Sequence, residues 1–100
     1  MKAGRRVGQT RRRDQEEDAI VRALVAIGVV VLRVSGPGAP DLLGYRGGRW
    51  LPMEVKSRRG TLTIRQQNTR VLAPFPVVRS VAEALALWGV TVTGVTVVPS

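Results

Sequence analysis

The chain has 100 residues, of which 44% are hydrophobic, enough for one domain with a single apolar core. It contains no cysteine and no histidine, so disulfides, zinc–thiolate sites and histidine-based catalysis are excluded; a bound metal would need oxygen ligands, which favours Mg²⁺ or Mn²⁺. The net charge of +9 points to a polyanion such as nucleic acid, and the absence of a long apolar run or a signal peptide predicts a cytoplasmic protein with no membrane partner.

The first thirteen residues are basic and show no apolar periodicity. Segments of this kind either bind a phosphate backbone or only keep the chain soluble, and we favour the first alternative. We therefore expect a disordered basic arm over residues 1–13 and a single domain over residues 14–100. The arginines of the arm are Arg5, Arg6, Arg11, Arg12 and Arg13.

Apolar residues at helical spacing predict a first helix over about residues 15–27, with Asp14 as N-cap and Gly28 as its C-terminal stop. Acidic residues near its start suit the positive end of the helix dipole and need no catalytic role. Glu17 also lies one turn before the apolar face, so it could point inward.

Residues 29–34 form a continuous apolar and β-branched run, which predicts a buried strand. Residues 35–40 are rich in Gly and Pro and predict a loop that delivers Asp41 to the next strand.

The stretch from Asp41 to Lys56 predicts a β-hairpin. Its two-residue loop, Gly47-Gly48, is typical of a type I′ turn, in which both residues take positive φ. In this register the paired residue numbers sum to 95, which places Asp41 opposite Glu54. Opposed carboxylates are close enough to hold one divalent cation, and Lys56 shares their face. The alternative is a solvated face on which Lys56 or an arginine neutralises the acids.

Pro52 is the uncertain point of this register. Because proline has no N–H, its presence indicates either an edge position or a bulge, and a bulge would turn the opposition of Asp41 and Glu54 into a diagonal. In the regular register Tyr45 and Trp50 are opposed as well and would stabilise the hairpin.

A basic turn over residues 57–60 follows the hairpin, and Thr63 with Gln66 then forms a capping box for a helix that runs to about Leu72. The arginines here that face solvent or phosphate are Arg58, Arg59, Arg65 and Arg70.

The last part of the chain predicts a strand over residues 75–79 and a capping box at 80–83 that opens a helix over 81–88. Residues 90–98 alternate and are rich in Val and Thr, which predicts either one long strand with a bulge or a small hairpin.

In this order of elements the chain resembles the PD-(D/E)XK nuclease superfamily and, within it, the virus-type replication-repair nuclease (VRR-NUC) family, whose small stand-alone members occur in phages and bacteria. The resemblance implies an α/β, restriction-endonuclease-like fold: a mixed central sheet flanked by helices, in the order α-β-β-β-α-β-α-β. The matching blocks are Gly38–Leu43, Met53–Ser57, Leu62–Gln66 and Val77–Leu85.

The resemblance also implies the roles of single residues. Asp41 and Glu54 would ligate Mg²⁺ or Mn²⁺, and Lys56 would orient or activate the attacking water. The carbonyl of Val55 and, as a further candidate, Glu17 would add to the metal ligands. Glu17 matches the acid of the family's first helix, with Glu16 as the competing residue, and Gln66 matches the family's glutamine.

The expected function is therefore that of a metal-dependent DNA endonuclease selective for branched DNA, such as four-way junctions or flaps. Stand-alone relatives imply a homodimer, with no small-molecule cofactor, in a bacterial or phage-infected cell. The alternatives are a non-catalytic nucleic-acid-binding module, or a nuclease-fold subunit of a replication or repair complex. The Val-rich segment beyond Gly89 departs from the family pattern and leaves the dimer arrangement open.

Overall fold

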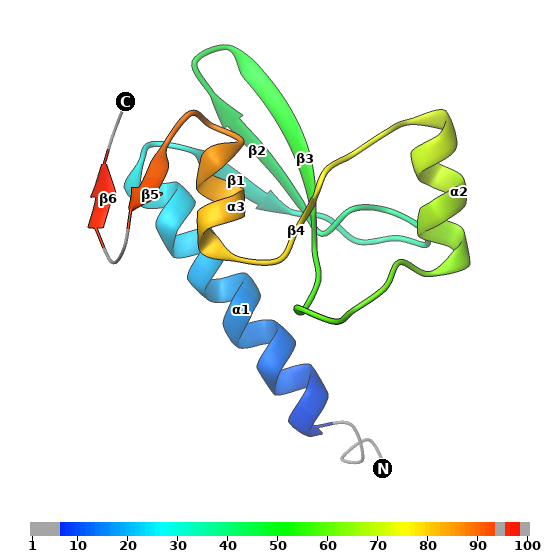
Figure 1. Cartoon of the computed structure of the whole chain (residues 1–100). Helices are drawn as coiled ribbons and strands as arrows, with labels where there is room; N and C mark the ends of the chain where they lie inside the picture. The colour runs from blue at the N-terminus through cyan, green and yellow to red at the C-terminus, as the bar shows by residue number, and fades with distance from the viewer. Residues whose placement is uncertain (1–6, 94–95, 99–100) are drawn as a thin grey trace.

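A mixed four-stranded sheet flanked by helices is the centre of the molecule (Figure 1). The computed structural model describes residues 7–93 and 96–98, and the side chains of residues 15–91. The sheet has the order β1-β2-β3-β4 and is antiparallel except for the parallel pair β3 and β4. The predicted α/β class with a mixed sheet is confirmed. The elements in chain order are α1 (Val7–Ala26), β1 (Val30–Arg33), β2 (Leu42–Arg46), β3 (Arg49–Val55), α2 (Ile64–Leu72), β4 (Val77–Val78), α3 (Val81–Ala86), β5 (Thr91–Thr93) and β6 (Thr96–Val98).

Helix α1 is longer than expected, because its helical backbone begins at Val7. Asp14 therefore lies within the helix and is not its N-cap, which corrects the predicted start of the helix; the separate basic arm over residues 1–13 stays a prediction, and residues 1–6 lie outside the described part of the chain. The physical reason is cooperativity. The buried Ile20 fixes the later turns, and Arg and Gln have high enough helix propensity to extend an existing helix backwards at little cost.

The C-terminal end of α1 is as predicted. Gly28 has φ +90°, and the N–H of Val29 donates a 3.0 Å hydrogen bond to the carbonyl of Leu24 across it. This is the Schellman arrangement, in which a glycine takes the left-handed conformation and reverses the chain. It turns the chain directly into β1.

Strand β1 is an edge strand, which corrects the expectation of a buried strand. Val31 packs against the core, but Val30 and Leu32 on the other face are 56% and 48% exposed. A continuous apolar run is compatible with burial of both faces of a strand. It does not show whether a helix or a second sheet covers each face. Here one face of β1 has no covering layer within the described chain.

The hairpin of β2 and β3 has the predicted register. Arg46 pairs with Arg49 around the turn, where Gly47 and Gly48 have φ values of +61° and +81°. Pro52 pairs with Leu43 without a bulge. The rings of Tyr45 and Trp50 pack with their centroids 4.8 Å apart.

Pro52 fits this register because its nitrogen points away from β2. The N–H groups of Glu54 and Lys56 are bound by carbonyls of the β4 segment, and the strand period of two gives Pro52 the same direction. Strand β4 pairs only with Glu54 and Val55, so it does not reach Pro52. The missing N–H therefore costs no ladder hydrogen bond.

The C-terminal elements are shorter than predicted. Strand β4 has two residues, and α3 ends at Ala86. Ser80 caps α3, but the carboxylate of Glu83 accepts from the N–H of Arg79, not of Ser80, so the capping box is only half formed. The small-hairpin alternative is confirmed for the tail, where β5 pairs with β6.

The apolar core lies where the sheet meets α1 and α3. Leu42 and Met53 face it, so the alternate residues of the hairpin, including Glu54, point to the opposite face of the sheet. Within the described ranges, no helix combines the length and hydropathy that a membrane span requires. The buried core residues are Ile20, Leu24, Val29, Leu42, Met53, Val55, Val78, Ala84, Leu85, Trp88 and Val90.

The loop over residues 35–40 connects β1 to β2 and packs against α2. The N–H of Val34 donates a 2.8 Å hydrogen bond to the carbonyl of Asp41, which closes the loop. Gly38 has φ +75°, and a Cβ at this position would lie 2.6 Å from Thr69 Oγ1 and 3.0 Å from the carbonyl oxygen of Arg65, both in α2. Only glycine both adopts this positive φ readily and leaves room for the backbone to approach α2 so closely.

We predict that Gly38→Ala destabilises the fold more than Gly47→Ala does. Both glycines have positive φ, so both variants carry about 1–2 kcal/mol of backbone strain, but a Cβ at Gly47 meets no atom within 4 Å. The steric conflict at Gly38 should add at least about 1 kcal/mol. Urea denaturation of the two variants measures the difference, and equal losses would contradict the close packing of the loop on α2.

Candidate active site

Glu54 is the most deeply buried charged residue of the described chain, with a side chain that is 0% exposed. Its Oε2 accepts a 2.7 Å hydrogen bond from Gln66 Nε2 and lies 3.4 Å from Lys56 Nζ. Its Oε1 is also buried and has no hydrogen-bond partner among the described residues. An unsatisfied buried carboxylate oxygen is costly, so this atom marks a position where a cation or a further donor is needed.

Asp41 lies beside Glu54, where the ladder between β2 and β3 ends. Its Oδ2 accepts a 3.0 Å hydrogen bond from the N–H of Val55. This N–H points to the side of β2, opposite to those of Glu54 and Lys56. The carboxylate of Asp41 thus replaces the missing strand partner, and the hydrogen bond fixes it against β3.

Gln66 serves as a cap and as a partner of Glu54 at the same time. Its backbone N–H donates to Thr63 Oγ1, and its Oε1 accepts from the N–H of Thr63, so the predicted capping box is confirmed. Because Oε1 is used in this way, the amide group turns its Nε2 toward Glu54. The two predicted roles of Gln66 are therefore compatible.

The electrostatics of the site are dominated by burial. Desolvation raises the pKa of Glu54 above the ordinary value of 4.5, and the charge of Asp41 raises it further. Lys56 and the hydrogen bond from Gln66 lower this pKa, and they do not cancel the effect of burial. The described residues around Glu54 thus do not offset the cost of burying its charge.

The donor set fits a hard divalent cation. Mg²⁺ in proteins is commonly held by one or two carboxylates together with waters and substrate phosphates, and Asp41 and Glu54 with the unpartnered Oε1 supply such a pair. Among the residues whose side chains are described, no group of three or more acidic residues is placed to hold a metal. Glu17 does not complete such a group.

The acids of α1 are placed differently from each other. Glu17 and Asp18 both form ion pairs with Arg33 at the end of β1. Glu16 has a buried Oε1 with no hydrogen-bond partner among the described residues. Sequence analysis missed Arg33, because an ion pair between residues far apart in the chain leaves no local signal. The choice between Glu17 and Glu16 as the helix acid of the site stays a prediction.

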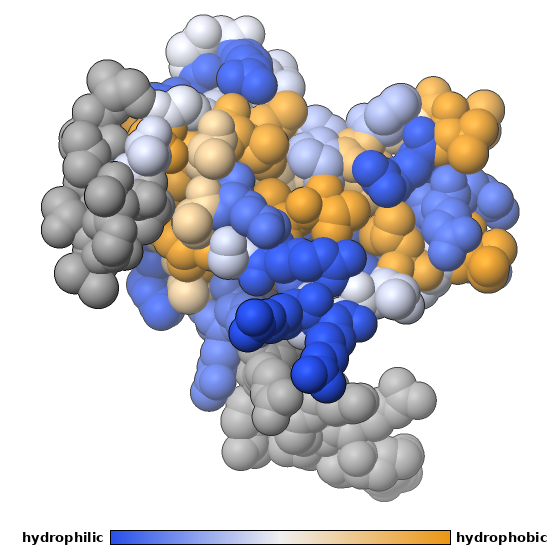
Figure 2. All heavy atoms as spheres, viewed as in Figure 1, coloured by the Kyte–Doolittle hydropathy of each residue, from blue (hydrophilic) through white to orange (hydrophobic). Residues whose placement is uncertain are grey.

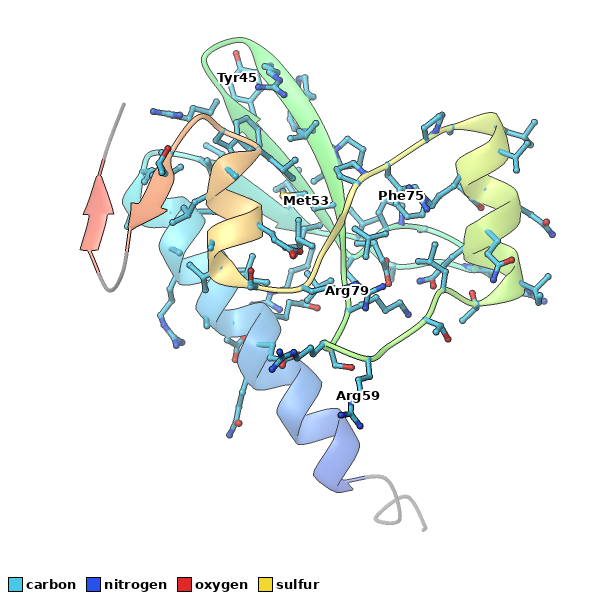
Figure 3. The ribbon with its side chains drawn as sticks, in the orientation of Figure 1. Tyr45, Met53, Arg59, Phe75 and Arg79 are labelled. Atoms are coloured by element: carbon cyan, nitrogen blue, oxygen red, sulfur yellow. The ribbon has the colours of Figure 1, made fainter. Side chains whose placement is uncertain are left out.

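The arginines predicted to bind DNA are only partly described. Arg58, Arg59 and Arg65 are exposed. Hydrophilic side chains gather in the middle of the face that Figure 2 shows, and Arg59 lies on the same side of the molecule (Figure 3). Arg70 is exposed too, but its Nε donates a 3.0 Å hydrogen bond to the carbonyl of Phe75. The other predicted residues, Arg5, Arg6, Arg11, Arg12 and Arg13, lie outside the described side chains.

A mixed sheet that presents Asp, Glu and Lys at the end of a central hairpin defines a domain of the PD-(D/E)XK nuclease type. The family model described as archaeal Holliday junction resolvase (Hjc) matches residues 8–98, and the chain belongs to this family. The superfamily prediction is confirmed, whereas the narrower resemblance to VRR-NUC is not shown. The curated proteins and the solved structures contain no match to the chain.

We predict that ionisation of Glu54 destabilises the metal-free protein. Its pKa is raised in the folded state, so below about pH 4.5 the carboxyl is protonated whether folded or unfolded, and stability is lost as the pH rises through the folded pKa. Relative to wild type, Glu54→Gln should become progressively more stable between pH 4.5 and neutrality. Urea denaturation in EDTA across this range measures the effect; a constant difference would show that Glu54 does not titrate in this way.

Proposed function

We propose that the protein is a divalent-metal-dependent endonuclease that hydrolyses phosphodiester bonds in branched DNA, with four-way junctions as its main substrate. The observation that carries the proposal is the buried Glu54 carboxylate, with its unpartnered Oε1 next to Asp41 and Lys56. Membership of the Holliday junction resolvase family supports the choice of substrate. The metal is Mg²⁺ or Mn²⁺, because the available ligands are oxygens.

A bound cation would neutralise charge on the scissile phosphate and make a water nucleophilic at neutral pH. Asp41 and Glu54 would hold it, and the carbonyl of Val55 is a further candidate ligand because the Val55 N–H beside it is bound by Asp41. Lys56 is positioned by Glu54 Oε2 at 3.4 Å, so its ammonium group can orient the attacking water or contact the phosphate. Gln66 keeps the carboxylate of Glu54 in its orientation.

The exposed arginines give the DNA a path to this site. Arg58 and Arg59 lie two and three residues after Lys56, on the exposed turn, and Arg65 is exposed on α2. Guanidinium groups bind phosphates in a bidentate manner. We propose that these three arginines contact the backbone on either side of the scissile phosphate, and that the basic N-terminal segment adds to this surface.

A non-catalytic DNA-binding module is the alternative function. It would explain the charge of +9, but it gives no reason for the burial of a carboxylate beside a second carboxylate and a lysine. Buried, charge-coupled carboxylates of this kind cluster at functional sites, which favours the enzyme.

We also propose that the protein is a homodimer and that the outer face of the sheet is its interface. On this face two rows cross the sheet, Val30–Tyr45–Trp50 and Leu32–Leu43–Pro52. Val30, Leu32 and Trp50 are each about half exposed, and no member of the two rows carries a charge. In a chain of net charge +9, an uncharged apolar face is where two copies can associate with least repulsion. Two copies would supply the two sites that paired incisions require.

The metal-dependent cleavage is tested with labelled four-way, flap and linear DNA. Wild type should cut the four-way junction only when Mg²⁺ or Mn²⁺ is present, and Asp41→Asn, Glu54→Gln and Lys56→Ala should each lower the rate by at least about 100-fold, as expected for loss of a metal ligand or a water-orienting group. Gel-shift binding in EDTA is the control for folding. If the protein binds DNA but does not cut it in a metal-dependent way, the proposed enzyme function is wrong. If it cuts all three DNAs equally, the proposed preference for junctions is wrong.

The dimer is tested by placing a charge on the outer sheet face. Leu32→Glu should shift the protein from dimer to monomer in analytical ultracentrifugation, because a buried unpaired carboxylate at an interface costs several kcal/mol. Ile64→Glu is the matched control, since Ile64 is apolar and 70% exposed but lies on α2. A monomeric wild type, or a Leu32→Glu variant that stays dimeric, contradicts this interface.

A further inference from the structure

Arg79 connects β4 and the start of α3 with the turn that follows Lys56, which is about twenty residues earlier in the chain. It follows β4 directly, and the N–H of Lys56 donates a 3.1 Å hydrogen bond to the carbonyl of the preceding Val78. Its own N–H donates a 2.7 Å hydrogen bond to Glu83 Oε1 at the start of α3. The backbone around Arg79 is therefore held by Lys56, through Val78, and by Glu83 of α3.

The side chain of Arg79 reaches back to the turn that follows Lys56. Its Nη1 donates two hydrogen bonds, one of 2.7 Å to the carbonyl of Ser57 and one of 2.6 Å to the carbonyl of Gly60. A guanidinium NH₂ group has two hydrogens, so one nitrogen can hold both carbonyls at once. Figure 3 shows Arg79 between β4 and this turn, with Arg59 on the turn below it.

The turn held in this way is folded onto Lys56. The N–H of Gly60 donates a 3.1 Å hydrogen bond to the carbonyl of Ser57, which closes the turn. A Cβ built at Gly60 would lie 3.5 Å from Lys56 Cβ, so Gly60 packs against the base of the lysine side chain. Movement of the carbonyls that Arg79 holds would therefore change the surroundings of Lys56 and the direction of Arg58 and Arg59.

We propose that Arg79 is a positioning residue: it fixes the turn over residues 57–60 and thereby sets the geometry of Lys56 for the cleavage step. The inference rests on the proposed endonuclease function. It assigns Arg79 no contact with the metal or the phosphate, and it explains why this arginine is half-buried instead of lying on the DNA-facing surface. The salt-independent hydrogen bonds to carbonyls, and not the charge as such, perform the role.

The test compares Arg79→Gln and Arg79→Lys with wild type, with Arg22→Gln on the exposed side of α1 as the control for loss of one positive charge. Three quantities are measured: the single-turnover rate on a four-way junction at saturating enzyme, the junction Kd in EDTA, and the melting temperature. We expect Arg79→Gln to lower the rate by about 10- to 100-fold, the loss that small misplacements of reacting groups produce, with a change in Kd of less than about threefold. Arg79→Lys should recover part of the rate, because an ammonium group can donate to both carbonyls.

The turn itself gives a readout that does not depend on activity. Arg58 and Arg59 are exposed trypsin sites, and cleavage after them, identified by mass spectrometry, should be faster in Arg79→Gln than in wild type or Arg22→Gln. If wild type cuts junctions and Arg79→Gln cuts as fast, or if the rate falls only in proportion to the unfolded fraction, the positioning role is wrong while the proposed function stands. If wild type does not cut at all, the proposed function fails, and the trypsin result alone then decides whether Arg79 holds the turn.

Discussion

The burial of the Glu54 carboxylate is the constraint on which the rest of this structure depends. Burying a carboxylate is costly unless its oxygens have partners, and among the described residues only Oε2 has them: Gln66 from α2 and Lys56, which directly follows β3. The second carboxylate, Asp41, increases the cost, because its charge disfavours ionisation of Glu54. Because Oε1 of Glu54 has no hydrogen-bond partner among the described residues, the protein itself does not fully offset the cost of this burial, and the proposed metal site rests on that observation.

This constraint also explains how α2 is held. Of the nine residues of α2, Gln66 is the one that is buried, while Ile64, Val71 and Leu72 are 70% to 88% exposed. The helix is therefore attached mainly by polar contacts and by the close approach of Gly38, not by an apolar face. The helix is thus held at Gln66, the residue that donates a hydrogen bond to Glu54. A change that loosens α2 is therefore expected to disorder Glu54 as well.

The arginines of the chain have two uses, and composition does not separate them. Arg33 binds carboxylates of α1, the side chains of Arg46 and Arg79 donate to backbone carbonyls of distant segments, and that of Arg70 donates to the nearby carbonyl of Phe75. These four residues hold loops and helices in place, as the delocalised guanidinium group is suited to do. A hydrogen bond to a carbonyl leaves the charge of an arginine in place, so these residues still count toward the +9, and composition alone does not separate them from exposed arginines such as Arg58 and Arg59.

Local chemistry in the sequence was sufficient to predict the elements whose conformation is set by neighbouring residues. Gly47-Gly48 determined the turn, the turn determined the register, and the register brought Asp41 next to Glu54; the capping box of Thr63 and Gln66 likewise determined where α2 begins. What only the tertiary structure decided depends on contacts between distant segments. The edge position of β1, the extension of α1 to Val7 and the hydrogen bonds of Arg33 and Arg79 are of this kind. No periodicity or spacing records them, because whether a second layer covers a strand, or which carbonyl an arginine reaches, is fixed only when the whole chain has packed.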